Sequence, residues 1–112
     1  KQGYAKCSTA VVSDEAIITA DLQIYRKAVE VGLDALLIPP QKNIILKGYD
    51  YGFIGGCSGI ISDKEIAFTG DLNTLDAGDS VIRFCEKHGK KAIFLANGNL
   101  TDLGSLFPLT SV

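Results

Sequence analysis

Cys57 is the residue of this chain best suited to nucleophilic chemistry, because it stands among glycines in the segment GGCSG, with Gly55, Gly56 and Gly59 around it. Glycines let a ligand approach the backbone closely, and a cysteine thiolate is a strong nucleophile. The same glycines also suit a strand bulge, and a free cysteine is commonly a small buried residue. The segment therefore predicts either a reactive thiol or a packing position, and we expect the packing position.

Asp21 and Asp71 are acidic residues whose positions could support binding of a cation. Each follows a short apolar run, in the tetrapeptides TADL and TGDL. An aspartate between a strand and a helix commonly caps the helix, whereas an available carboxylate binds a planar cationic group. Asp71 is the better candidate, because Asn73 extends the loop after it and functional residues concentrate on loops. The candidate ligand-binding residues are Asp71, Asn73, Cys57, Ser58 and Asp21.

The chain has one histidine, His88, directly before a glycine at the expected end of a helix. A helix C-terminus stabilises a charged histidine, so this pattern predicts a surface residue rather than a general base. The cysteines Cys7, Cys57 and Cys85 are widely spaced and form no CxxC motif. Because this set lacks the spacing of a metal site, we expect no metal and no cofactor.

Composition narrows the class of protein. The 112 residues carry a net charge of −2 and are 46% apolar, which is typical of a single globular domain. The basic cluster at residues 87–91 is shorter than a nucleic-acid-binding tract, so a nucleic-acid partner is not expected. No apolar run is long enough to cross a membrane, and reduced thiols indicate a cytoplasmic protein. A redox sensor using Cys57 would need a neighbouring cation, which the sequence does not show.

The two halves of the chain resemble each other. A shift of 50 aligns residues 7–22 with residues 57–72 without gaps, and six of the sixteen positions are identical, against about one for average composition. This shift places Cys7 on Cys57 and Asp21 on Asp71. A catalytic cysteine is not expected in both copies, so the pairing favours a structural role for both thiols. Further along, a shift of 57 aligns residues 25–38 with residues 82–95.

Each half predicts the order strand, strand, helix, strand, which gives an α/β (α+β) fold with two tandem ββαβ repeats. Gly32 is expected to end the first helix, and Asp76 is expected to cap the second. The expected strands are 8–12, 16–19, 35–38, 58–62, 65–70 and 91–97, and the expected helices are 22–32 and 78–89. The apolar run at 35–38 suits a strand buried on both faces. The expected parts of this single domain are repeat one at about 4–39, a connector at about 40–54, repeat two at about 55–97 and a tail at 98–112.

Tandem ββαβ units of this length resemble the pentein fold of guanidino-group modifying enzymes, in which five units surround a narrow channel. The motifs GCSG, TGD, HG and LTDLGSLFPL resemble, more narrowly, the C-terminal part of an uncharacterised bacterial family of that fold. The resemblance implies a fragment of a longer chain, since five units of about 50 residues need about 250 residues. It also implies self-association, or association with the missing part of its own ring, because incomplete repeat arrays leave faces uncovered.

Pentein enzymes resemble one another in using a cysteine nucleophile, a histidine and two carboxylates that hold a guanidinium group. This resemblance makes Cys57 the candidate nucleophile and a small cationic compound the candidate ligand, but His88 does not match the family's base. Asp102, Gly104 and Ser105 suggest a turn, with a loop lining the channel as the alternative. We therefore expect a domain of unknown function that is catalytically silent in isolation. The alternatives are part of a hydrolase or amidinotransferase acting on guanidines or amidines, and a non-catalytic binding or scaffold module.

Overall fold

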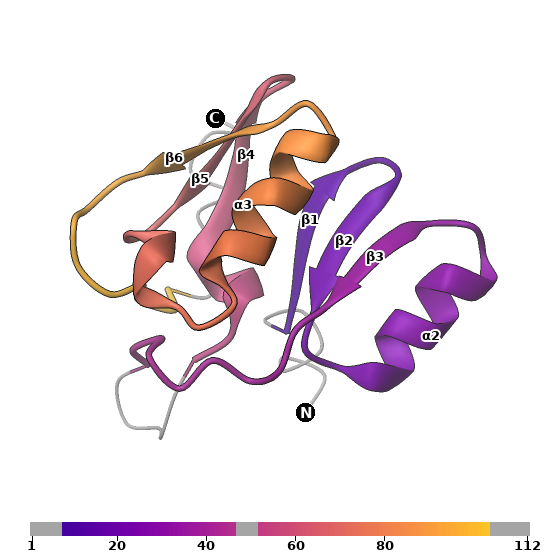
Figure 1. The fold of residues 1–112 in the computed structure, drawn as a ribbon, viewed down its shortest axis with the longest axis horizontal. Helices are drawn as coiled ribbons and strands as arrows, with labels where there is room; N and C mark the ends of the chain where they lie inside the picture. The colour runs from indigo at the N-terminus through magenta and orange to yellow at the C-terminus, as the bar shows by residue number, and fades with distance from the viewer. Residues whose placement is uncertain (1–7, 47–51, 104–112) are drawn as a thin grey trace.

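A computed structural model describes residues 8–46 and 52–103 of the chain. These residues form a mixed α+β domain that contains two three-stranded sheets and two α-helices (Figure 1). This architecture agrees with the expected α+β class. Cys7, Gly104 and Ser105 lie outside the described residues.

The first sheet has the strand order β1-β2-β3. Strands β1 (Thr9–Ser13) and β2 (Ala16–Thr19) form an antiparallel hairpin, and β3 (Asp34–Leu37) pairs with β2 in parallel. Helix α2 (Leu22–Glu30) makes the crossover between the two parallel strands, as a parallel pair requires. In the run expected to be buried on both faces, Ala35 and Leu36 are only half-buried and Leu37 is exposed, so that expectation is wrong for all of the run except the buried Ile38.

The second sheet has the order β4-β5-β6 and the same pattern of pairing. The short 3₁₀ helix η1 (Ile54–Cys57) leads into the hairpin of β4 (Ser58–Ser62) and β5 (Glu65–Phe68). A second 3₁₀ turn, η2 (Leu72–Thr74), and helix α3 (Gly78–Lys87) lead to β6 (Lys91–Phe94), which is parallel to β5. Both halves of the described chain therefore follow the predicted order of strands and helix.

The C-terminal ends of both helices agree with the sequence, whereas the N-terminal end of α3 differs from the expectation. Gly32 and Gly89 follow the two helices with φ of 93° and 75°, a conformation that favours glycine. Asp76, expected to cap α3, does not do so. The cap residue is Ala77, whose methyl side chain cannot accept a hydrogen bond.

The backbone hydrogen bonds correct the alignment of the two hairpins by one residue. Ala20 N donates to Ser8 O, and Thr69 N donates to Cys57 O. These bonds make Ser8 the counterpart of Cys57, an offset of 49 rather than 50. The tight turns fix this register, since Ser13 pairs with Ala16 and Ser62 pairs with Glu65. The offset of 57 for the helices and third strands is supported, because Leu33 N donates to Ala28 O as Lys90 N donates to Cys85 O.

Helix α3 lies between the two sheets and joins their cores (Figure 1). Its inward residues are Val81, Phe84 and Cys85, which pack in one cluster with Ile18 of the first sheet and Phe68 of the second. Helix α2 has only Ala28 buried and leaves apolar side chains exposed, namely Leu22, Val29 and Val31. The interior is thus concentrated around the second half, and α2 has one face without a partner among the described residues.

Candidate functional site

Cys57 lies at the end of η1, and its side chain is completely buried. Its thiol donates a hydrogen bond to Phe53 O at 3.2 Å. The predicted position at the opening of a strand is one residue early, because β4 begins at Ser58. Burial and a backbone partner make Cys57 a packing residue in this conformation.

The glycine cluster around Cys57 accommodates a buried carboxylate. A Cβ atom at Gly56 would collide with the Asp102 carboxylate, and one at Gly52 would collide with the Asp102 side chain. Asp102 is only 6% exposed, and its Oδ2 accepts a hydrogen bond from Phe53 N at 2.9 Å. Close approach of a side chain to the backbone is therefore the reason for glycine at these two positions.

Asp102 ties three distant segments together. Its backbone N donates to Ile45 O at 2.7 Å, and the next residue, Leu103, donates to Gly56 O at 2.8 Å. Thr101 forms a parallel bridge with Ile45, and the Asp102 side chain is buried. The turn expected over Asp102, Gly104 and Ser105 extends beyond the described residues and stays a prediction. One signal for this contact is present in the sequence, namely an acidic residue in an apolar tail together with glycines at 52 and 56. The structure brings Cys57 and Asp102 to the same residue, Phe53.

Asp21 and Asp71 cap the starts of α2 and η2, as the capping interpretation predicts. Asp21 Oδ1 accepts from Gln23 N at 2.8 Å and from Ile24 N at 3.1 Å. Asp71 Oδ1 accepts from Asn73 N at 2.8 Å. Each carboxylate satisfies amide groups that have no partner within the helix.

The five candidate ligand-binding residues each occupy a different element or helix cap. Ser58 begins β4 and is buried, whereas Asn73 is exposed in η2 next to its cap, Asp71. Asp21 belongs to the first half of the chain, at the start of α2. The geometry therefore groups Asp71 with Asn73, and Cys57 with Ser58, as chain neighbours.

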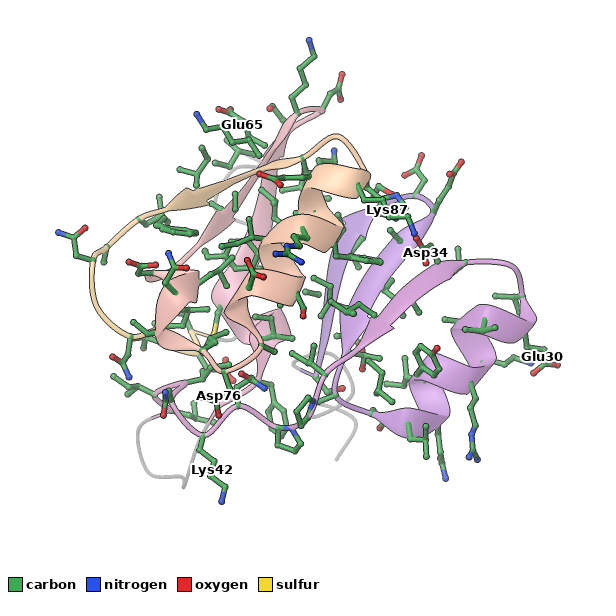
Figure 2. The ribbon with its side chains drawn as sticks, viewed as in Figure 1. Glu30, Asp34, Lys42, Glu65, Asp76 and Lys87 are labelled. Carbon is green, nitrogen blue, oxygen red and sulfur yellow. The ribbon has the colours of Figure 1, made fainter. Side chains whose placement is uncertain are left out.

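His88 joins the two halves of the domain. It is the C-terminal cap of α3, as expected, but its side chain is only 15% exposed, so the predicted surface position is wrong. Its Nε2 lies 2.8 Å from Asp34 Oδ2, and Lys87 Nζ lies 2.9 Å from the same oxygen (Figure 2 labels Asp34 and Lys87). The histidine ring also contacts the Phe84 ring, with centroids 4.9 Å apart. The end of α3 is thus held against the start of β3.

The charges at this contact shift the pKa of Asp34. The hydrogen bond from Lys87 and then that from His88 lower the pKa of the Asp34 carboxyl below its ordinary value of 3.8. Cys85 shows the opposite effect of burial, which raises the pKa of its thiol to about 12. A thiol with that pKa remains protonated and is a poor nucleophile near neutral pH.

Asp34→Asn should remove part of the dependence of stability on pH. The lowered folded pKa means that Asp34 stabilises the protein above about pH 4, and that this contribution is lost as the pH falls through the folded pKa. The carboxylate is partly exposed, so we expect a difference below about 1 kcal/mol at pH 7. Urea unfolding of the variant and the wild type should show this difference at pH 7 and a smaller one near pH 3. Asp14→Asn, at an exposed turn, is the control, and an equal pH profile for all three proteins would contradict the prediction.

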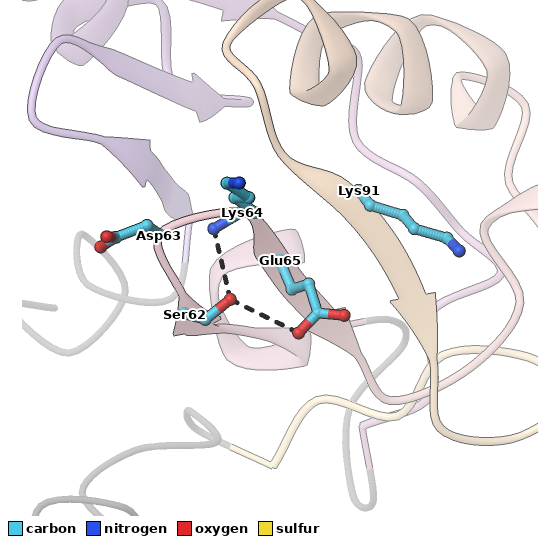
Figure 3. Close-up of a pocket in the computed structure, with 5 residues that line it drawn as sticks. All are labelled: Ser62, Asp63, Lys64, Glu65 and Lys91. Carbon is cyan, nitrogen blue, oxygen red and sulfur yellow. Dashed lines mark hydrogen bonds between the residues drawn. The ribbon is translucent and has the colours of Figure 1, made fainter.

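An open pocket of about 470 Å³ lies at the hairpin of the second sheet (Figure 3). It is lined by Ser62, Asp63, Lys64, Glu65 and Lys91. Within it, Ser62 Oγ accepts from Lys64 N at 3.2 Å and donates to Glu65 Oε1 at 3.4 Å. Its charged side chains of both signs suit contact with a charged partner surface. Sequence reasoning missed this pocket, because it combines the hairpin turn with a strand from 26 residues further along.

Two classes of site are absent from the described part of the chain. Among residues 8–46 and 52–103, no three His, Cys, Asp or Glu side chains are grouped as a metal site would require. No helix in the same ranges is both long and apolar enough to cross a membrane.

The described residues define a small α+β domain with two three-stranded sheets, in which Cys57, Asp102, Asp21 and Asp71 all make hydrogen bonds within the fold. The chain belongs to a family of unknown function, DUF6873, whose pattern matches residues 1–107. No curated protein and no solved structure matches this chain.

Proposed function

We propose that this chain is a non-catalytic assembly segment: two ββαβ repeats of a pentein-like ring, catalytically silent in isolation. The observation that carries the proposal is the burial of Cys57, whose thiol is hydrogen-bonded to Phe53 O rather than available to a substrate. The identical strand order of the two sheets supports the repeat, and the packing of α3 in one core cluster with both sheets supports an assembly of such units.

The acidic candidates support the same proposal. Asp21 and Asp71 already accept amide hydrogen bonds as caps, and Asp102 holds the tail to the segment before β4. Burial also keeps the Cys85 thiol protonated, through a pKa of about 12. We place the protein in the cytoplasm, where the free thiols of Cys57 and Cys85 would stay reduced.

Thiol labelling tests whether the cysteines are unreactive in the folded protein. We expect Cys57 and Cys85 to react with iodoacetamide only at the rate at which the chain unfolds, with labelled sites assigned by mass spectrometry. Urea should accelerate both reactions together. A Ser80→Cys variant, at an exposed position of α3, supplies a matched accessible thiol. Labelling of Cys57 in the folded protein as fast as that of the introduced thiol would overturn the proposal.

One observation favours a second function, a hydrolase or amidinotransferase acting on a guanidine or amidine compound. Cys57 and Asp102 bond to the C=O and the N–H of the same residue, Phe53, so a thiol and a carboxylate lie in one small region. In such an enzyme the carboxylate would bind the guanidinium. The Cys57 sulfur would form a C–S bond with the amidine carbon, the C–N bond to the leaving amine would break, and that amine would take the thiol proton. Turnover of a guanidine library that Cys57→Ser abolishes would support this function.

A further inference from the structure

The packing of α3 on the first sheet defines what one docking contact requires. The C-terminal end of α3 presents Lys87 and His88 to Asp34, the first residue of β3. On the same face of that sheet, Ile18 and Leu36 pack into the core cluster with Phe84. This contact therefore needs two features of the sheet: an apolar face that packs on the helix, and an acidic residue at one edge that pairs with the basic end of the helix.

The corresponding face of the second sheet, which we call the open face, is exposed at its margins among the described residues, whereas Ala67 at its centre is only 3% exposed. Leu95, which directly follows β6, lies on that face by alternation from Lys91 and is 58% exposed. Ile61, the extra residue at the register shift before Ser62, is 48% exposed. The opposite face carries Ile66 and Phe68, which are fully buried. Lys91 lies at the edge of the open face, next to Glu65 in parallel register, and both line the pocket shown in Figure 3.

The charge at the edge of this open face is reversed relative to the first sheet. The offset of 57 that relates the third strands makes Lys91 the counterpart of Asp34. The same offset makes Glu30 of α2 the counterpart of Lys87, and Val31 the counterpart of His88. In the internal contact, the acidic edge of the first sheet pairs with the basic end of α3. The second sheet has a basic edge instead, and α2 has an acidic end, so these two could pair in the same way with the charges exchanged.

Both halves of this second contact are available on the surface. Val31 is 60% exposed and Val29 is 51% exposed, so α2 presents apolar side chains beside Glu30 (labelled in Figure 2). Glu30 has a local partner, Lys27, at 3.7 Å, but both side chains are about 70% exposed. An exposed pair of this kind is weak and would yield readily to an intermolecular one.

We propose that the open face of the second sheet binds helix α2 of a second copy of this chain, with Glu30 paired to Lys91 and Val31 packed at the position that His88 occupies in the internal contact. This inference rests on the proposed assembly role and names the partner and the surfaces. Lys27 and Glu65 have the signs needed for a second pair. Because the two surfaces differ, the contact is head-to-tail and produces closed rings or longer chains of copies.

Sedimentation velocity over a range of concentrations tests the contact through a charge swap. The wild type should associate as the concentration rises. Glu30→Lys and Lys91→Glu should each weaken association about tenfold, because each places like charges opposite one another. The double variant, with both changes, should restore association to near the wild-type level. Lys42→Glu and Asp76→Lys make the same charge changes at exposed positions outside α2 and the second sheet, and should have no effect (Figure 2).

Each outcome decides the inference. A wild type that stays monomeric at every concentration overturns it, and so does association that the single charge reversals leave unchanged. Failure of the double variant to restore association overturns the Glu30–Lys91 pairing. Circular dichroism of every variant should show an intact fold, because both residues are exposed. The thiol-labelling test is made on the monomer at low concentration, so it reports on catalytic silence whatever the association experiment gives.

Discussion

Replacement of Gly56 by alanine is expected to lower the free energy of unfolding by about 2–4 kcal/mol. The new methyl group would occupy the space of the Asp102 carboxylate, which is buried and hydrogen-bonded to Phe53 N. The carboxylate must then move away from its donor, or η1 must shift. Either change also strains the hydrogen bond from Leu103 N to Gly56 O, which holds the tail in place.

Gly98→Ala is the matched control for this prediction. A Cβ at Gly98 meets no atom within 4 Å, so the same substitution should change stability by less than about 0.5 kcal/mol. Urea unfolding at pH 7 measures both variants. If Gly56→Ala proved as stable as Gly98→Ala, the buried Asp102 carboxylate could not be the reason for the glycine.

Regular elements were predictable from this sequence because they depend on local patterns. Alternating apolar residues gave the hairpins, and Gly32 and Gly89 gave the helix ends. The alignment of the first hairpin on the second was wrong by one residue, because identical residues such as Thr19 and Thr69 favoured an ungapped alignment. The turns decide the register instead, and Gly70 supplies the extra residue between the second strand and the Asp71 cap.

The candidate site was less predictable because it depends on contacts between distant segments. Asp21 and Asp71 act on amides two or three residues away, so their capping role could be predicted. The Asp102 carboxylate is hydrogen-bonded to Phe53 N, 49 residues earlier, and the His88 ring is hydrogen-bonded to Asp34, 54 residues earlier. No periodicity within a single element encodes such pairs, and a lone histidine before a glycine looks the same whether or not a sheet edge covers it.

Thr69→Val is expected to lower the free energy of unfolding by about 2–4 kcal/mol. The Thr69 hydroxyl donates to Thr101 O at 2.8 Å and accepts from Thr101 N at 2.9 Å. Valine has nearly the same shape but removes both bonds, and it leaves an amide and a carbonyl of the tail without their partner. The cost of such unsatisfied backbone groups, rather than lost packing, sets the size of the effect.

Thr9→Val is the control that measures the cost of losing an ordinary threonine hydroxyl, without loss of bonds to the backbone of residue 101. The Thr9 hydroxyl has one side-chain partner, Thr19 Oγ1 at 3.1 Å, so its removal should cost less than about 1 kcal/mol. Hydrogen exchange of the amides at 100–103 should increase in Thr69→Val and not in Thr9→Val, since only the first variant releases the tail. Equal costs for the two variants would show that the bonds of Thr69 to Thr101 add nothing to the loss of an ordinary threonine hydroxyl. A larger cost for Thr69→Val would establish that side chains of the second hairpin hold residues 100–103 against the sheet.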